Sequence, residues 1–281
     1  MKKILLMAMA IVTVTSVWAQ SKFPEGYLTD ETRPNGLRWL PAPPKLTGAD
    51  FTYDFYYYQW GRDMRENETV SEQALYDESA SLDDVYEGIL GVKLTDETTP
   101  EIITLLQRAV SDAHAANKKV KDEWKRVRPF AQFKEPSLKP EEDEEEAGTY
   151  SYPSGHSSRG WISAFVFATL APDLAEDLFC RAREYALNRV ICGHHWKTDI
   201  DASLMLAAGI FATLVCTDAY QAQLVKARAE YKKIKEGTVN VPQAKIVQHP
   251  ASQQAYTANG TPATESSRGI IIQNGQKTVK K

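Results

Sequence analysis

The stretch Pro153-Ser154-Gly155-His156 begins the part of the chain that decides the fold, and Arg189-Val190-Ile191-Cys192-Gly193-His194-His195-Trp196-Lys197-Thr198-Asp199 ends it. Between them, residues 160–171 are apolar and predict one helix, and Pro172-Asp173 begins a second that should end near Cys192. A third apolar helix is expected over 200–219. These apolar runs fall short of about 18 uninterrupted residues, so they predict buried core helices and not membrane spans.

The upstream sequence predicts more helices. Thr98-Thr99-Pro100-Glu101 is typical of a helix start, with Thr99 as the N-cap and Pro100 at the first helical position. Apolar residues keep helical spacing from there to Val127, and Pro129 should end the helix. One or two short helices are expected within 72–93, and a charged surface helix over 221–235. Almost no stretch alternates with period two, so we expect an all-α architecture, a compact bundle of several helices.

The two ends of the chain differ from its middle. Met1-Lys2-Lys3, the apolar run 4–17 and Ala19 are typical of a cleavable secretory signal peptide (1–19), which predicts a periplasmic or secreted protein. The apolar run is shorter than the ~20 residues that a membrane anchor needs. Residues 20–50, rich in Pro, Gly and Thr, predict an extended N-terminal arm before a helical domain over 51–236. The polar residues 237–281 predict a flexible tail.

Composition excludes some classes of partner. The formal net charge of −4 argues against a nucleic-acid polymer, because binders of nucleic acid usually present a basic face. An anionic ligand must therefore be attracted by a local cluster of cations. Among the three cysteines, Cys180 and Cys192 fall on one predicted helix about 18 Å apart, too far for a disulfide. Cys216 could pair with either of them or with neither.

Two segments leave alternatives open. The dense aromatic run from Phe51 to Trp60 could line a ligand groove, although packing of one helix into the core is the favoured interpretation. The six acidic residues 141–146 predict a solvated loop. A lid that controls access to a cationic site is the alternative for this segment. Calcium or magnesium binding is less favoured, because no spaced ligand loop accompanies the acidic run.

Several cationic and hydrogen-bonding groups fit a tetrahedral oxyanion. Lys121 and Arg128 stand two turns apart on the predicted helix and would share a face, although a solvated basic face explains them equally well. Ser154 and Gly155 precede a helix, where a hydroxyl, an unhindered backbone and the helix dipole favour an anion. An ordinary helix cap by Ser154 is the alternative. Arg189 adds a further fixed cation near the second motif.

The histidines suggest covalent chemistry on that oxyanion. His195 and Asp199 are four residues apart and meet if the backbone is helical. A carboxylate that is hydrogen-bonded to one ring nitrogen fixes the tautomer of the histidine and leaves the other nitrogen free for nucleophilic attack. His156 lies at the rim of the oxyanion cradle. A metal site is the competing explanation, but His194 and His195 are adjacent and the nearby cations would repel a metal, so we predict none.

Taken together, these motifs resemble a known superfamily. Lys121-(six residues)-Arg128-Pro129, Pro153-Ser154-Gly155-His156 and Arg189-(five residues)-His195-(three residues)-Asp199 are similar to the three-part signature of the phosphatidic-acid-phosphatase type 2 (PAP2) and vanadium haloperoxidase superfamily. The segments that further resemble its bacterial class A non-specific acid phosphatases are Arg128-Pro129-Phe130-Ala131, Tyr152 to His156, Arg189 to Gly193, Leu40 to Pro44, Gly61-Arg62 and the helix around Gln223-Leu224. The resemblance covers roughly residues 39–235.

The resemblance implies a PAP2/haloperoxidase-like helical bundle and an acid phosphatase that needs no metal or cofactor. Its substrates would be small phosphate monoesters such as nucleotides, sugar phosphates and aryl phosphates, with transfer to alcohols as a second activity. By the same resemblance His195 attacks phosphorus and forms a phosphohistidine, Asp199 orients it, and His156 protonates the leaving alcohol. The implied phosphate-binding residues are Lys121, Arg128, Ser154, Gly155 and Arg189. The resemblance alone also implies that vanadate inhibits the enzyme and that the protein forms a homodimer.

Two positions depart from the family pattern. Asn188 stands where the family usually has serine, and we expect it to tune the pocket. Arg159 stands where relatives commonly carry an apolar residue, and it should add a cation near the cradle.

Three other functions remain open. A vanadium-dependent haloperoxidase would use the same residues to bind vanadate. A lipid-phosphate phosphatase is weakened by the lack of predicted membrane spans. A phosphate-binding protein would not require His156, His195 and Asp199 together.

Overall fold

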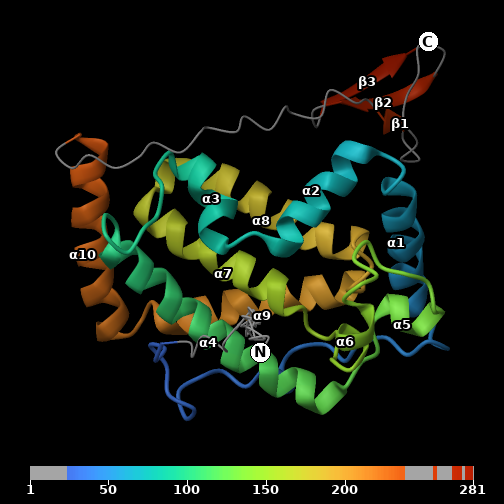
Figure 1. Ribbon diagram of the computed structural model, residues 1–281, viewed down its shortest axis with the longest axis horizontal. Helices are drawn as coiled ribbons and strands as arrows, with labels where there is room; N and C mark the ends of the chain where they lie inside the picture. Colours follow the sequence, from blue (N-terminus) through green and yellow to red (C-terminus); the bar gives the residue numbers. More distant parts are fainter. Residues whose placement is uncertain (1–23, 238–255, 258–267, 274–275, 281) are drawn as a thin grey trace, which may run out of the picture.

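Helix α7 (Gly155–Leu170) lies at the centre of the molecule. In the computed structural model, which describes residues 24–237, 256–257, 268–273 and 276–280, it packs against α4 (Pro100–Trp124), α8 (Ala175–Ile191) and α9 (Lys197–Leu214) (Figure 1). Apolar side chains surround most of this helix, and such a helix is stable only when neighbours cover it on several sides. Its fully buried side chains include Ile162, Val166 and Phe167.

Helix α4 begins where the sequence predicts. Thr99 is the N-cap and Pro100 the first residue, but the Thr99 side chain makes no cap hydrogen bond. The carboxylate of Glu230 replaces it, because it accepts hydrogen bonds from the Glu101 and Ile102 amides at 3.2 and 2.9 Å. Glu230 belongs to α10 (Asp218–Lys235), so this contact fixes α10 against the start of α4.

The end of α4 differs from the prediction. The helix stops at Trp124, where Lys125 adopts a left-handed backbone with φ of 47°. Arg128 then has an extended backbone and is the N-cap of the next helix, α5 (Pro129–Phe133). The prediction that Lys121 and Arg128 lie two turns apart on one helix was therefore wrong. They reach the same region through a chain reversal.

A short connection joins α8 to α9 and carries the second histidine motif. Gly193 has φ of +82°, and a Cβ at this position would lie 2.4 Å from the Arg65 guanidinium. The positive φ favours glycine here, and a Cβ would also displace the end of the Arg65 side chain. The amides of His194 and His195 both donate to the Arg189 carbonyl, at 3.2 and 3.3 Å. The sharp turn therefore holds Arg189 and His195 together.

The remaining helices surround this core. Helix α1 is far to the right in Figure 1 and α10 far to the left, at opposite ends of the long helices α4, α7 and α9. The predicted third helix is interrupted, because α9 ends at Leu214 and Thr217 then caps α10 by accepting from the Tyr220 amide. The other helices are α1 (Phe51–Met64), α2 (Glu68–Ser79), α3 (Leu82–Leu90) and α6 (Asp143–Ala147).

The segments outside the bundle differ in what the structure describes. Residues 24–50 contain one short 3₁₀ helix, η1 (Gly36–Arg38), and Tyr27 in this arm donates its amide to Asp112 of α4 at 2.7 Å. The predicted signal peptide and much of the predicted tail lie outside the described residues. The described part of the tail pairs as an antiparallel sheet, β1 (Tyr256–Thr257), β2 (Gly269–Gln273) and β3 (Gln276–Lys280).

The all-α class is confirmed for the domain, whereas the strands of the tail were not predicted. The cysteines Cys180, Cys192 and Cys216 are free. No single helix among the described residues is long and apolar enough to cross a membrane. Helices α9 and α10 meet that test only as a pair, and the pair is bent by 93°.

Candidate active site

His195 is the centre of the site. Its ring is almost fully buried, with Nδ1 3.4 Å from Asp199 Oδ2 and Nε2 3.1 Å from Nη1 of Arg128. Because a guanidinium only donates, Nε2 is the acceptor and the ring proton is assigned to Nδ1. Burial, followed by the charges of Arg128 and Lys121, holds the pKa of His195 well below its usual value. The ring is therefore neutral, with a lone pair on Nε2.

Asp199 orients His195 through a fully buried carboxylate. Oδ2 also accepts from the Trp196 amide at 2.8 Å, and Oδ1 accepts from Arg126 at 2.6 Å. Burial raises the pKa of Asp199, and the Arg126 charge opposes that shift. Arg126 also contacts Asp54 of α1 at 2.5 Å, and Asp54 accepts from the Thr198 amide at 2.8 Å.

Neither Arg126 nor Asp54 is indicated by the sequence motifs. Arg126 stands in a run of basic residues, where no local pattern separates it from its solvated neighbours. Asp54 is the one acid in the aromatic run 51–60, and its burial could have been suspected from that setting alone.

Arg128 connects His195 to the acidic segment. Its Nη1 donates to the His194 carbonyl at 3.0 Å, and its Nε and Nη2 donate to Thr149 Oγ1 at 3.0 and 2.8 Å. Glu146 of α6 lies 2.6 Å from Nη2. The predicted solvated loop 141–146 is thus partly helical, and the prediction was wrong for Glu146, whose carboxylate covers one of the predicted oxyanion-binding cations.

The N-terminus of α7 meets the last turn of α4. A Cβ on Gly155 would lie 4.0 Å from Lys121 Cε, so the Gly155 backbone and the Lys121 side chain are neighbours. Burial, followed by the Arg128 charge, lowers the pKa of Lys121 to about 7. Ser154 Oγ accepts from the amide of Ser157 at 3.2 Å. The ordinary helix cap, which the sequence left open, is therefore the interaction that the structure shows for Ser154.

Arg189 is buried beside two groups that the sequence motif does not assign. Its Nη2 donates to Nδ1 of His194 at 2.9 Å, and its guanidinium contacts the carboxylate of Glu78, at the end of α2. Burial lowers the pKa of Arg189, and burial followed by the Arg189 charge lowers that of His194 to about 2. Glu78 and Glu146 thus place a carboxylate on each of two cations that the motif assigns to a phosphoryl group.

His156 lies in the first turn of α7. Its Nδ1 is 3.3 Å from Nη2 of Arg159, and its Nε2 is 3.3 Å from the Glu78 carbonyl. Arg159 must donate, so the proton is assigned to Nε2. Burial, followed by the charges of Arg159, Arg128 and Lys121, holds the pKa of His156 well below its usual value. His156 and His195 are thus influenced by the same two cations, Arg128 and Lys121.

Asn188, the first departure from the family pattern, points away from these groups. Its Nδ2 donates to Asp77 at 2.7 Å, and Asp77 also accepts from Arg181 at 2.8 Å. All three side chains are buried. Asn188 therefore fixes α8 against α2, the helix that carries Glu78, and its effect on the site is indirect.

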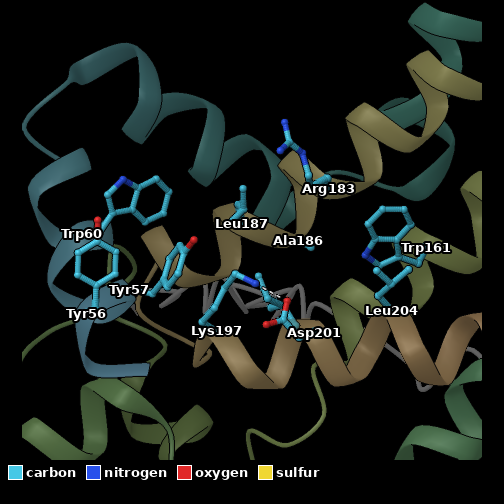
Figure 2. Close-up of a pocket in the computed structure, with 11 residues that line it drawn as sticks. Tyr56, Tyr57, Trp60, Trp161, Arg183, Ala186, Leu187, Lys197, Asp201 and Leu204 are labelled. Atoms are coloured by element: carbon cyan, nitrogen blue, oxygen red, sulfur yellow. Dashed lines mark hydrogen bonds and ion pairs between the residues drawn. The ribbon is translucent and has the colours of Figure 1, made fainter. Parts of the chain in front are cut away.

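A hollow lies between α1, α7, α8 and α9. Figure 2 shows Tyr56, Tyr57 and Trp60 of α1 opposite Trp161 of α7, around a cavity of about 470 Å³. Tyr58, in contrast, is buried and packs against Phe133 with ring centroids 4.6 Å apart. The core-packing interpretation of the aromatic run is thus right for Tyr58, while its neighbours line an open surface.

The arrangement combines a neutral buried histidine, its orienting carboxylate and several fixed cations within one region. Such a set can hold a tetrahedral oxyanion and place a nitrogen lone pair against it. Among the described residues, no group of three or more His, Cys, Asp or Glu side chains is placed to hold a metal ion.

Comparisons with known proteins agree with this chemistry. A model of the PAP2 superfamily matches residues 103–223. The chain is 34% identical over 214 residues to the non-specific acid phosphatase of Providencia stuartii, with 75% of this chain and 86% of the relative covered. It is 28% identical over 221 residues to the non-specific acid phosphatase of Salmonella typhimurium, with 77% and 88% covered. The acid phosphatase of Zymomonas mobilis is 33% identical over 144 residues, with 51% and 54% covered. The chain therefore belongs to the PAP2 superfamily and is one of its bacterial acid phosphatases.

Proposed function

We propose that the protein is an exported phosphatase that hydrolyses small phosphate monoesters, without a metal ion, through a phosphohistidine on His195. The observation that carries this proposal is the orientation of the His195 ring. Asp199 Oδ2 lies 3.4 Å from Nδ1 of the ring, and Nη1 of Arg128 lies 3.1 Å from Nε2. Nε2 therefore carries the lone pair and faces the cations. An attacking nitrogen needs this arrangement, because the ring becomes positively charged when it bonds to phosphorus.

In the first step, the Nε2 lone pair of His195 forms a bond to phosphorus while the bond to the ester oxygen breaks. Asp199 accepts the Nδ1 proton in a hydrogen bond and stabilises the imidazolium-like ring. Lys121, Arg128 and Arg189 balance the charge on the phosphoryl oxygens in the transition state. A substrate must displace the carboxylates of Glu146 and Glu78 from Arg128 and Arg189.

His156 supplies a proton to the leaving oxygen. The charges of Arg159, Arg128 and Lys121 hold its pKa low, but a bound phosphate ester carries negative charge that offsets them. Binding of substrate thus raises the proton affinity of His156 at the moment when the leaving alkoxide needs a proton.

In the second step, water attacks the phosphohistidine and the bond between Nε2 and phosphorus breaks. His156, now neutral, takes the proton from the attacking water. An alcohol that replaces water at this step receives the phosphoryl group, so transfer to alcohols follows from the same intermediate. Nucleotides, sugar phosphates and aryl phosphates are the proposed substrates.

The N-terminal sequence supports export. A basic start, a short apolar run and Ala19 before the predicted cleavage point are the features of a signal peptide. Amino-terminal sequencing of the exported protein tests this part of the proposal, and a mature chain that still contains residues 1–19 contradicts it.

The mechanism is tested by p-nitrophenyl phosphate hydrolysis of the mature protein in excess EDTA, beside His195→Ala. We expect turnover to survive chelation and to be lost in the variant. The trapped intermediate is sought after a neutral or alkaline quench, because phosphohistidine is acid-labile. Activity destroyed by EDTA contradicts the metal-free mechanism. A wild type that binds vanadate and oxidises halide with peroxide, but does not turn over the ester, is a haloperoxidase instead.

A further inference from the structure

A cavity of about 620 Å³ adjoins His156. Its wall combines the His156 ring and Tyr185 with apolar side chains from α3 and α4, among them Leu82, Leu106 and Val110. In the proposed mechanism His156 gives its proton to the leaving oxygen, so the alcohol part of the substrate has to lie on the side of His156. The cavity is the space on that side, and its wall should select the leaving group.

Most charges in this wall already have an opposite partner. Lys139 forms an ion pair with Glu142, and Glu78 contacts Arg189. Burial, followed by the neighbouring acids Glu87, Asp84 and Asp96, raises the pKa of the remaining wall carboxyl, Asp83, to about 6. Asp83 is therefore about half neutral at pH 6 and largely neutral at pH 5 and below.

Arg159 is different, because its charge has no such partner. Its guanidinium donates one hydrogen bond, to Nδ1 of His156 at 3.3 Å, and no carboxylate of the described residues lies within ion-pair distance of it. A guanidinium has five N–H donors and a permanent charge, so most of its donors remain available to a ligand. The side chain is half-buried, which strengthens an interaction with an anion relative to a fully solvated site.

The position of Arg159 limits where that anion can be. Arg159 follows His156 by three residues, about one helical turn or ~4.5 Å of rise along α7. The guanidinium already touches the ring that protonates the ester oxygen. An anionic group bound by Arg159 must consequently lie only a few bonds from the ester oxygen of the substrate.

We propose that Arg159 makes the cavity beside His156 a subsite for leaving groups that carry a second anionic group, a carboxylate or a phosphoryl group, close to the ester oxygen. The preferred substrates are then small phosphorylated hydroxy acids and compounds with two neighbouring phosphoryl groups. This inference rests on the proposed role of His156. An apolar residue at position 159 would not favour substrates with such a second anionic group.

The test compares two substrates of equal size, phosphoglycolate and its neutral amide, phosphoglycolamide. The quantity measured is the ratio of their kcat/KM values at pH 5, where Asp83 is largely neutral. We expect a ratio of at least ten for the wild type, because only the carboxylate can form charge-assisted hydrogen bonds with the guanidinium. In Arg159→Met the ratio should fall at least tenfold, and in Arg159→Lys it should fall by less. Arg183→Met, an exposed arginine of α8 at the other cavity, is the matched control and should keep the wild-type ratio.

Comparison of the two substrates separates this role from an effect on His156. If Arg159→Met lowers both kcat/KM values by the same factor, Arg159 acts through the His156 ring and the subsite proposal is wrong. A wild-type ratio near one overturns the proposal without any variant, and Arg159→Gln serves if the methionine variant does not fold. Hydrolysis of p-nitrophenyl phosphate is measured in parallel. Its absence in the wild type would refute the proposed function, whereas its presence with no anion preference refutes only the subsite.

Discussion

Glu146→Gln should strengthen the binding of inorganic phosphate. The carboxylate of Glu146 lies 2.6 Å from Nη2 of Arg128, a residue that the proposed mechanism assigns to the phosphoryl oxygens. Phosphate has to displace this carboxylate before it can use the guanidinium. Glutamine keeps the length of the side chain and an acceptor oxygen, but it removes the negative charge that competes with the ligand.

The magnitude follows from the geometry of the pair. Two unit charges at 2.6 Å attract by about 6 kcal/mol at an effective dielectric constant of ~20. The Glu146 side chain is 33% exposed, so much of this attraction is offset by solvation and by the cost of holding the side chain in place. A net contribution of about 1–2 kcal/mol remains, in the range of hydrogen bonds to charged groups. That contribution corresponds to roughly a 5- to 30-fold lower inhibition constant for phosphate.

The assay is competitive inhibition of p-nitrophenyl phosphate hydrolysis by inorganic phosphate. Glu144→Gln is the matched control, because it removes the same charge from an exposed position of the same short helix. Its inhibition constant should stay within about twofold of the wild-type value, since exposed charges are screened by salt. If both variants change phosphate binding equally, net charge is the cause and not the contact with Arg128. Weaker phosphate binding by Glu146→Gln would refute the competition outright.

Two further predictions concern other cations of the site. Burial is the main cause that lowers the pKa of Lys121 to about 7 in the folded protein, so this side chain loses its charge as the pH rises through 7. Inhibition by sulfate should therefore weaken by up to about tenfold for each pH unit above 7. Lys121→Met should bind sulfate weakly at every pH, and an unchanged pH dependence in this variant would show that another group titrates. Arg126→Met leaves the fully buried carboxylates of Asp54 and Asp199 without their shared cation and should lower the free energy of unfolding by about 3–5 kcal/mol in urea denaturation. A loss below about 1 kcal/mol, or the same loss in the exposed neighbour variant Lys125→Met, would contradict this account.

Local patterns were enough to predict most of the helices. The Thr99-Pro100 start of α4 was predicted correctly because proline at the first helical position is a strong local signal. The end of the same helix was not, since the break at Lys125 occurs within a run of helix-compatible residues. The contact between His195 and Asp199 was also predicted correctly, because it depends on a spacing of only four residues.

The groups that surround the motifs could not be predicted from spacing. Glu78 reaches Arg189 from a helix more than a hundred residues away in sequence, and Glu146 comes from an acidic run whose composition alone indicates solvent. Arg126 carries the same positive charge as the exposed Lys125 beside it and differs in its tertiary contacts. Pairs of this kind are set by how the helices pack, and no local pattern encodes them.

The contact between Asp54 and Arg126 bears on the smallest fragment that can function. The superfamily match covers residues 103–223 and contains all three motifs, so a truncated protein with these boundaries would carry every residue assigned to catalysis. It would lack α1, however, and with it the carboxylate that binds both Arg126 and the amide of Thr198 at the start of α9. His195 and Asp199 stand beside that start. The catalytic unit should therefore extend back to about residue 51, well before residue 103, where the superfamily match begins.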